Sequence, residues 1–347
     1  MCRRAARETI LAEIGGFGAR WCAVLLVESG SVTKIVHISD LHFGRPAVSE
    51  RLDALKSQIE SLSPDAIAVS GDLTQQCRTA EFQRAREYLD ALSKTAPYLV
   101  IPGNHDIRWL GAVSRNLGLS SRFRRKAHDF KYSRYTTNIS RELSPSLEIP
   151  GAVIAGLNTA HGISRGSLTR RMRDLGVIGH VRQRDVEMVR RTFDSAAPDA
   201  ARIVMIHHNP IKGDTSGRHG LANTQKALKS FVRLGAELIL CGHDHQEAVH
   251  STDEGFQGLI ISTAGTISNR LRQGRSSSFN LVEIDRDAIR IVPHLWRESL
   301  FVAAGTSTFE RRRKNDPLSA GAEDGDENRA ETSSQRNTAN PERPKES

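Results

Sequence analysis

The stretch KIVHISDLH, residues 34–42, joins a short apolar run to a carboxylate and an imidazole, Asp40 and His42. The same arrangement recurs along the chain, where polar clusters again follow apolar runs. The other clusters are Gly71-Asp72, Gly103-Asn104-His105-Asp106, His207-His208 and Gly242-His243-Asp244-His245. A single Asp-x-His is explained by ordinary loop polarity. A series of such clusters after strand-like runs indicates a metal site, because metal sites collect imidazole and carboxylate ligands.

The first part of the chain alternates between strand-like and helix-like segments. Apolar runs at 34–38, 66–69 and 98–101 enclose helix-like segments at 49–62 and 80–92. This alternation predicts a largely parallel, buried sheet. In such a sheet ligands bind outside the carboxyl ends of the strands, so the polar clusters should meet at one edge.

The rest of the chain predicts more elements of both kinds. Strands are expected at 152–155, 203–206 and 238–240, with helices at 183–193 and 224–234. Three further runs, 258–262, 279–284 and 288–292, are typical of antiparallel strands joined by turns, and they suggest a second sheet packed on the first. Residues 108–150 have weak periodicity and are expected to form a basic helical cap or insertion.

Length and composition are typical of a soluble, globular protein. A chain of 347 residues can form one large α/β domain, which we place at 32–304. We expect residues 1–31 to be an N-terminal extension, poorly ordered or helical, and 305–347 a disordered polar tail. No apolar run approaches the roughly 20 residues of a membrane-spanning helix. The four cysteines lie far apart, which favours a reducing, cytoplasmic compartment over a disulfide framework.

The net charge of +9 has two interpretations. Lys and Arg are concentrated at 108–134 and 165–191. These segments are either solvated helix faces or a positive rim that attracts phosphate-bearing substrates. The charge therefore leaves a small phosphate ester and a nucleic acid open as partners.

In order and in residue type, the clusters resemble the calcineurin-like metallophosphoesterase family. The family pattern is Asp-x-His, Gly-Asp, Gly-Asn-His-(Asp/Glu), His and Gly-His-x-His, and no motif is missing across residues 33–291. The surroundings HISDLHFG, VSGDLTQ and IPGNHD are similar to a bacterial branch that includes 3′,5′-cyclic nucleotide phosphodiesterases related to class III enzymes. The resemblance implies an α/β fold, a four-layer αββα sandwich of two facing mixed β-sheets flanked by helices, with a binuclear metal centre.

The resemblance also implies a role for each polar residue. One ion would be held by Asp40, His42 and His245, the other by Asn104, His207 and His243, and Asp72 would bridge both. The bridge is chemically reasonable, because two divalent ions about 3.5–4 Å apart need a shared anion to reduce their repulsion. These ligands suit Mn, Fe, Zn or Co. A hydroxide bridging the ions would be the nucleophile.

His105 would not bind metal in this family; it faces the phosphate and either protonates the leaving alkoxide or stabilises the transition state. Asp106 either holds the His105 ring or caps the segment that follows. In His207-His208-Asn209-Pro210, aligning the proline in two ways selects His207 or His208, and we prefer His207 because it directly follows the apolar run. Substrate contacts are expected from the remaining candidates, Asn158, His161 and His208.

The predicted function is metal-dependent hydrolysis of phosphomonoesters or phosphodiesters, with a 3′,5′-cyclic nucleotide as the first choice of substrate. A nuclease and a lipid-linked pyrophosphate hydrolase are the enzymatic alternatives. A catalytically inactive scaffold is the alternative from another class, but such relatives lose ligands, and all seven expected ligands are present here.

Overall fold

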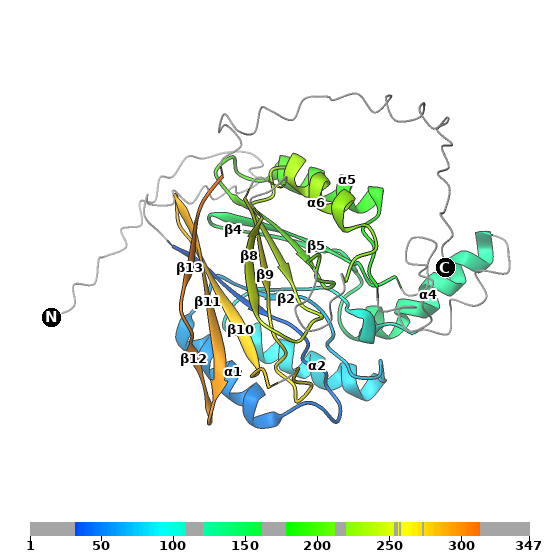
Figure 1. Ribbon diagram of the computed structural model, residues 1–347. Helices are drawn as coiled ribbons and strands as arrows, with labels where there is room; N and C mark the ends of the chain where they lie inside the picture. The colour runs from blue at the N-terminus through cyan, green and yellow to red at the C-terminus, as the bar shows by residue number, and fades with distance from the viewer. Residues whose placement is uncertain are drawn as a thin grey trace, which may run out of the picture.

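The computed structural model describes residues 32–108, 121–161, 178–211, 220–252, 256, 258–272 and 274–312. Two β-sheets face each other, and helices cover their outer faces (Figure 1). The predicted N-terminal extension lies outside the described residues, as do residues 313–347 and much of both basic segments. No helix in the described part of the chain has the length and apolar character that crossing a bilayer requires.

The first sheet has the order β12-β11-β10-β1-β2-β3, and β13 pairs with β11. The strands β1, β2 and β3 are parallel to one another, while β10 runs antiparallel to β1. Their bounds are β1 (Thr33–Ile38), β2 (Ala66–Val69), β3 (Tyr98–Val100), β10 (Ser278–Ile284), β11 (Ala288–Arg297), β12 (Leu300–Ala303) and β13 (Ser307–Glu310).

The second sheet has the order β4-β5-β6-β7-β9-β8. Its four inner strands are parallel, and β4 and β8 close its edges in the antiparallel sense. The bounds are β4 (Ser146–Ile149), β5 (Ala152–Leu157), β6 (Ala201–Ile206), β7 (Leu238–Cys241), β8 (Ala248–Thr252) and β9 (Leu259–Thr263).

The helices pack on the outer faces of the sheets. On the first sheet lie α1 (Ser49–Leu62) and α2 (Thr79–Leu92), and on the second lie α5 (Gln183–Ser195) and α6 (Thr224–Arg233) (Figure 1). The 3₁₀ turn η1 (Asn104–Asp106) follows β3, and α4 (Ser121–Asn138) packs against α2. The predicted four-layer sandwich is therefore confirmed.

Both faces of the central strands are buried, which explains why their sequences are continuous apolar runs. In β1, Ile35 packs between the two sheets, and the next residue, Val36, packs under the helices. This alternation follows from the two-residue repeat of a strand. The layer between the sheets joins Ile35 to residues of the second sheet such as Ile154 and Leu240. Burial on both faces makes these strands a rigid base for the loops at their ends.

Three details of the sequence-based topology are wrong. The strands predicted at 279–284 and 288–292 extend the first sheet, because β10 pairs with β1, while β9 joins the second sheet parallel to β7. The predicted cap at 108–150 ends too late, since Ser146–Ile149 is the edge strand β4. The tail predicted from 305 begins too early, because Ser307–Glu310 pairs with β11. The pairing of β10 with β1 joins segments far apart in the chain, whereas β4 pairs with β5, the next strand in the sequence.

Arg311, just after β13, attaches the end of the described chain to the second sheet. Its guanidinium donates to both carboxylate oxygens of Glu237, at 2.9 and 3.0 Å, and Glu237 also accepts from the backbone N–H of Arg202. Both members of the ion pair are nearly buried, at 8% and 5% side-chain exposure.

We expect Arg311→Met to lower the free energy of unfolding by about 3–5 kcal/mol, because it leaves the Glu237 charge buried without its partner. Chemical denaturation would measure this. The double variant Arg311→Met/Glu237→Gln should recover part of the loss, and a truncation after residue 312 should not show it. Equal stability of wild type and Arg311→Met would contradict a role for this pair.

Candidate metal centre

The predicted site residues meet at one end of the sandwich, where strands of both sheets finish. Asp40 and His42 follow β1, Asp72 follows β2, and Asn104 follows β3 in the first sheet. In the second sheet, His207 follows β6, and the pair His243 and His245 follows β7. The site is thus built from the carboxyl ends of parallel strands, as expected for an α/β sheet.

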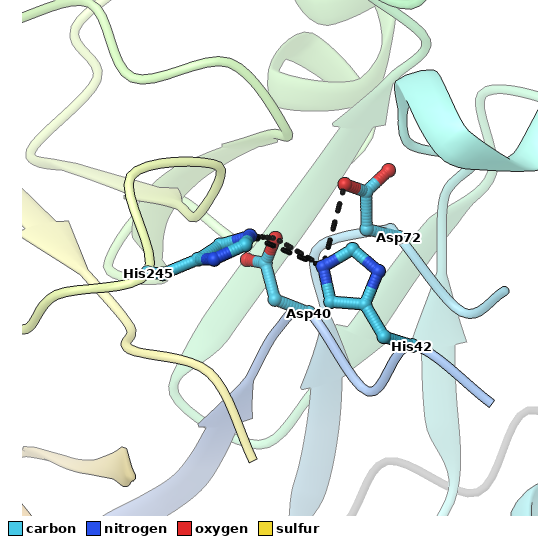
Figure 2. Close-up of side chains that lie close together, drawn as sticks. All are labelled: Asp40, His42, Asp72 and His245. Carbon is cyan, nitrogen blue, oxygen red and sulfur yellow. Dashed lines mark hydrogen bonds and ion pairs between the residues drawn. The ribbon is translucent and has the colours of Figure 1, made fainter. Parts of the chain in front are cut away.

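One group of side chains comprises Asp40, His42, Asp72 and His245, all buried, with potential ligand atoms within 4.8 Å of one another (Figure 2). The Nε2 atom of His245 lies 3.2 Å from Asp40 Oδ1 and 3.1 Å from His42 Nε2. His42 Nε2 in turn lies 3.9 Å from Asp72 Oδ2. The atoms surround a common point, as ligands of one cation would.

A second group lies beside the first and shares Asp72. Asn104 Oδ1 is 3.1 Å from His207 Nε2 and 3.0 Å from His243 Nδ1. His207 Nε2 is 3.4 Å from Asp72 Oδ1, whereas Oδ2 of the same carboxylate faces His42. Asp72 therefore presents one oxygen to each group, which is the arrangement expected of a bridging ligand.

The hydrogen bonds around the site show that both groups fit a cation. A carbonyl oxygen can only accept, so His207 Nδ1 donates to Ser70 O and His245 Nδ1 donates to Arg270 O, each at 2.8 Å. Their Nε2 atoms then carry lone pairs in the neutral ring. These lone pairs face further acceptors, Asn104 Oδ1 and Asp40 Oδ1, and the latter has no hydrogen-bond partner. Converging acceptors without donors are stabilised by a metal ion.

The charges in the site point the same way. Burial alone would raise the pKa of Asp72, but the neighbouring imidazoles, His207 first, outweigh it and hold that pKa well below its usual range. Burial likewise opposes the rise at His207, where the charge of Asp72 prevails and raises the pKa to about 9. Without a cation the Nε2 atom of His207 therefore binds a proton, which a metal ion would replace. Burial and His207 together lower the pKa of His243 to about 3. The centre is thus an anionic carboxylate among imidazoles, and it favours positive charge between them.

The backbone at the site is strained. Eight non-glycine residues in the described chain have positive φ, and five belong to the two groups: Asp40, His42, Asp72, His243 and His245. The φ values, between 45° and 76° at these positions, are uncommon for residues with a side chain. Such strain concentrates at functional sites, because the surrounding structure must hold it.

His105 lies beside the first group, with its ring centroid 4.9 Å from that of His42. Its Nδ1 donates to Gln75 O at 2.8 Å, so the other ring nitrogen, Nε2, is the one available for chemistry. Arg270 Nη1 donates to that nitrogen at 3.0 Å. The sequence analysis did not identify Gln75 or Arg270, because neither belongs to a polar cluster after a strand.

Asp106 does not hold the His105 ring, so that interpretation is wrong. Its carboxylate accepts from the backbone N–H groups of Leu73, Thr74 and Gly103, and from the Thr74 hydroxyl. The bond to Gly103 caps the turn η1, which Asp106 ends, and the others tie the loop after β2 to the loop after β3. Capping of the segment that follows stays a prediction, because residues 109–120 lie outside the described residues. Burial and the nearby charge of Asp72 raise the pKa of Asp106 to about 6.

The rings of His207 and His208 have different contacts, which favour His207 as the ligand. His207 points to Asp72 and Asn104, whereas His208 Nδ1 contacts the Thr159 hydroxyl at 2.7 Å. His208 packs against the rings of His207 and His243, and its Nε2 has no partner among the described residues.

The remaining candidates lie on the loop after β5. Asn158 caps this loop by accepting from Ala160 N at 2.9 Å. His161 is 2% exposed, with Nδ1 3.4 Å from the Tyr132 hydroxyl and Nε2 4.0 Å from Asp185. Neither contacts the predicted ligands, so a substrate contact by either stays a prediction.

Comparison with known proteins agrees with this geometry. A family model described as calcineurin-like phosphoesterase matches residues 33–247, more than half of the chain. The chain belongs to this family. As predicted, residues 33–247 form a phosphoesterase domain of this family, and they include a buried cluster of Asp and His that could hold a metal ion. The scaffold alternative, which required lost ligands, is not supported.

Individual relatives are distant. The glycerophosphodiester phosphodiesterase GpdQ of Enterobacter lignolyticus (strain SCF1) is 38% identical over 87 residues, which cover 21% of this chain and 29% of that protein. The match therefore spans less than a third of the relative. A dimetal phosphatase from Danio rerio has a TM-score of 0.54 at 13% identity and covers 81% of this chain and 99% of the other. The purple acid phosphatase PPD1 from yellow lupin has a TM-score of 0.57 at 13% identity, over 82% and 54%. The two structures show a shared fold.

We expect Asp72→Asn to lower the metal content and to abolish hydrolysis, because a neutral amide leaves the repulsion between two divalent ions poorly offset. Elemental analysis of the purified variant would measure the content directly. Asp244→Asn is the matched control: Asp244 lies between His243 and His245, but its carboxylate accepts from Asn209 at 2.7 Å instead of facing the site. A metal-replete Asp72→Asn protein with full activity would contradict the bridge.

Gly103→Ala should disable the site without unfolding the protein. The backbone of Gly103, at φ −93°, suits alanine, but a methyl group there would overlap the backbone nitrogen and Oδ1 of Asp72. A displaced carboxylate should cost about 10²-fold or more in kcat/KM, as misplacements of about 1 Å do. Gly305→Ala is the control for a clash: nothing lies within 4 Å of its added methyl, so the variant introduces only the backbone strain of a left-handed residue, at φ 74°. Wild-type turnover in Gly103→Ala would show that the close approach is unimportant.

Proposed function

We propose that the protein is a phosphodiesterase of small molecules, with 3′,5′-cyclic nucleotides as the first substrates to test and glycerophosphodiesters as the second. The observation that carries the proposal is the position of Asp72, with one oxygen toward each of two groups of acceptors. Such a centre suits attack on a phosphate ester. Cyclic nucleotides are favoured by the sequence around the motifs, and glycerophosphodiesters by the name of the relative GpdQ.

Hydrolysis adds water across a P–O bond: the oxygen of water joins phosphorus, and the alcohol leaves with a proton. Two divalent ions in the site would supply positive charge for the phosphate oxygens and lower the pKa of a bound water. The chain's own part is to place ligands rigidly. Asp72 shares its charge between the groups, and the backbone carbonyls of Ser70 and Arg270 fix the rings of His207 and His245.

His105 and Arg270 line the first group on the side of His42. The His105 ring is fixed by Gln75, so Nε2 is the atom that can meet an ester oxygen. In this arrangement Nε2 accepts from a guanidinium that cannot give up its proton. His105 would therefore have to part from Arg270 before it could protonate a leaving alkoxide.

A nuclease is the second candidate, and the net charge of +9 favours it. Binding to a polyanion releases counterions, so its affinity falls steeply with salt, whereas binding of a small diester depends on salt only weakly. Salt dependence therefore separates the two candidates.

The test is a hydrolysis panel with Mn, Fe, Zn and Mg. The substrates are bis(p-nitrophenyl) phosphate, p-nitrophenyl phosphate, 3′,5′-cyclic nucleotides, a glycerophosphodiester, a lipid-linked pyrophosphate and short DNA. We expect activity that chelation abolishes reversibly, and a higher kcat/KM for at least one small diester than for the monoester or DNA. Preference for DNA with steep loss in salt would support the nuclease instead, and preference for the monoester or the pyrophosphate would overturn the diesterase proposal.

A further inference from the structure

Arg270, in the loop after β9, touches two parts of the site at once. Its guanidinium Nη1 donates to His105 Nε2 at 3.0 Å and to Gln75 Oε1 at 3.3 Å. Its backbone carbonyl accepts from His245 Nδ1 at 2.8 Å. The residue therefore joins the loop after β9 to a predicted metal ligand and to the histidine beside it.

The charge of Arg270 has no acidic partner among the described residues. Its side-chain hydrogen bonds all go to uncharged groups, an imidazole and an amide. A neighbour in the same loop behaves differently, since Arg275 pairs with Glu247 at 3.3 Å. A partly buried guanidinium is costly to keep without an anion, so its position beside an anion-binding centre calls for an explanation.

The unused N–H donors of the Arg270 guanidinium indicate what the residue could bind. Only Nη1 is engaged, and Nε and Nη2 make no hydrogen bond in the described part of the chain. His105 and Gln75 fix the plane of the group, because both are acceptors and His105 is itself fixed by Gln75 O. A planar guanidinium with free donors matches the oxygens of a phosphate, which it can bind in a bidentate manner.

We propose that Arg270 is the phosphate-binding residue of this site, and that it holds a non-bridging oxygen of the ester through Nε and Nη2 while His105 and Gln75 position it. This inference rests on the proposed phosphoesterase function and adds the residue that anchors the phosphoryl group. It also gives His105 a positioning role toward Arg270, in place of proton transfer for as long as the two side chains stay hydrogen-bonded.

Arg270→Ala tests the side chain of Arg270 alone, because the substitution leaves its backbone in place. The variant keeps the carbonyl that orients His245, so metal content should stay at the wild-type level. We expect kcat/KM for bis(p-nitrophenyl) phosphate to fall roughly 10²–10³-fold, as for other lost transition-state donors. The inhibition constant of inorganic phosphate should rise at least about 10-fold, since a charged hydrogen bond is lost. Added guanidinium ion should restore part of the activity, and Arg270→Lys should recover less than the full rate because lysine lacks the fork.

Arg272→Ala is the matched control, because Arg272 is an exposed residue of the same charge in the same loop. It should retain wild-type turnover and phosphate inhibition. The proposal is overturned if Arg270→Ala loses metal, or if its phosphate inhibition equals that of the wild type, since either result would show a structural role. Calorimetric binding of inorganic phosphate to the wild type and Arg270→Ala tests Arg270 even if the wild type hydrolyses no diester, so failure of the proposed function would be seen separately.

Discussion

The carboxylate of Asp72, buried where three loops meet, is the constraint on which the site depends. Its Oδ1 accepts from the backbone N–H of His105 at 2.8 Å, and its backbone carbonyl accepts from His42 N at 3.0 Å. Gly103 packs so closely on it that no side chain fits between them. These contacts make the loops after β1, β2 and β3 a single unit. Asp106 strengthens that unit by accepting from the backbone of Leu73, Thr74 and Gly103.

The fold stabilises a backbone that the local sequence disfavours. A left-handed conformation costs roughly 1–2 kcal/mol for a residue with a β-carbon, and five residues of the site adopt it. The buried strands on either side offset this cost: β1 and β2 are paired in register, and both are buried between helices and the second sheet. The same turn that strains Asp40 and His42 lets their side chains face inward from positions two residues apart. Strain at these positions is thus a consequence of gathering several ligands in one place.

The second sheet completes the site from the other side. His207 and His243 reach Asn104 and Asp72 across the boundary between the sheets, and His245 reaches Asp40. The close approach of Gly242 to Asp40 and Ser39 shows how tightly the two sets of loops fit. Arg270, in the loop after β9 of the second sheet, also donates a hydrogen bond to His105 in the loop after β3 of the first sheet. Since both sheets supply ligands, the stability of their interface and the geometry of the site are linked.

The amino-acid sequence by itself determined the strand-end clusters and the alternation of strands and helices, because these depend on local order. The four-layer sandwich and the ligand roles followed from the resemblance of these clusters to a known family. An apolar run followed by Asp or His indicates where a strand ends and which ligand atoms the following loop contains. The tertiary structure alone decided which atoms meet. His207 and His208 are adjacent in sequence, but the ring of His207 faces Asp72 and that of His208 faces Thr159. The carboxylate of Asp106 accepts from backbone N–H groups such as that of Leu73, and not from the His105 ring. Likewise, β10 pairs with β1 from the far end of the chain, and Arg270 reaches His105 from another loop. Such contacts join residues distant in sequence, and their partners are selected by packing and by the satisfaction of buried polar groups, which no local pattern records.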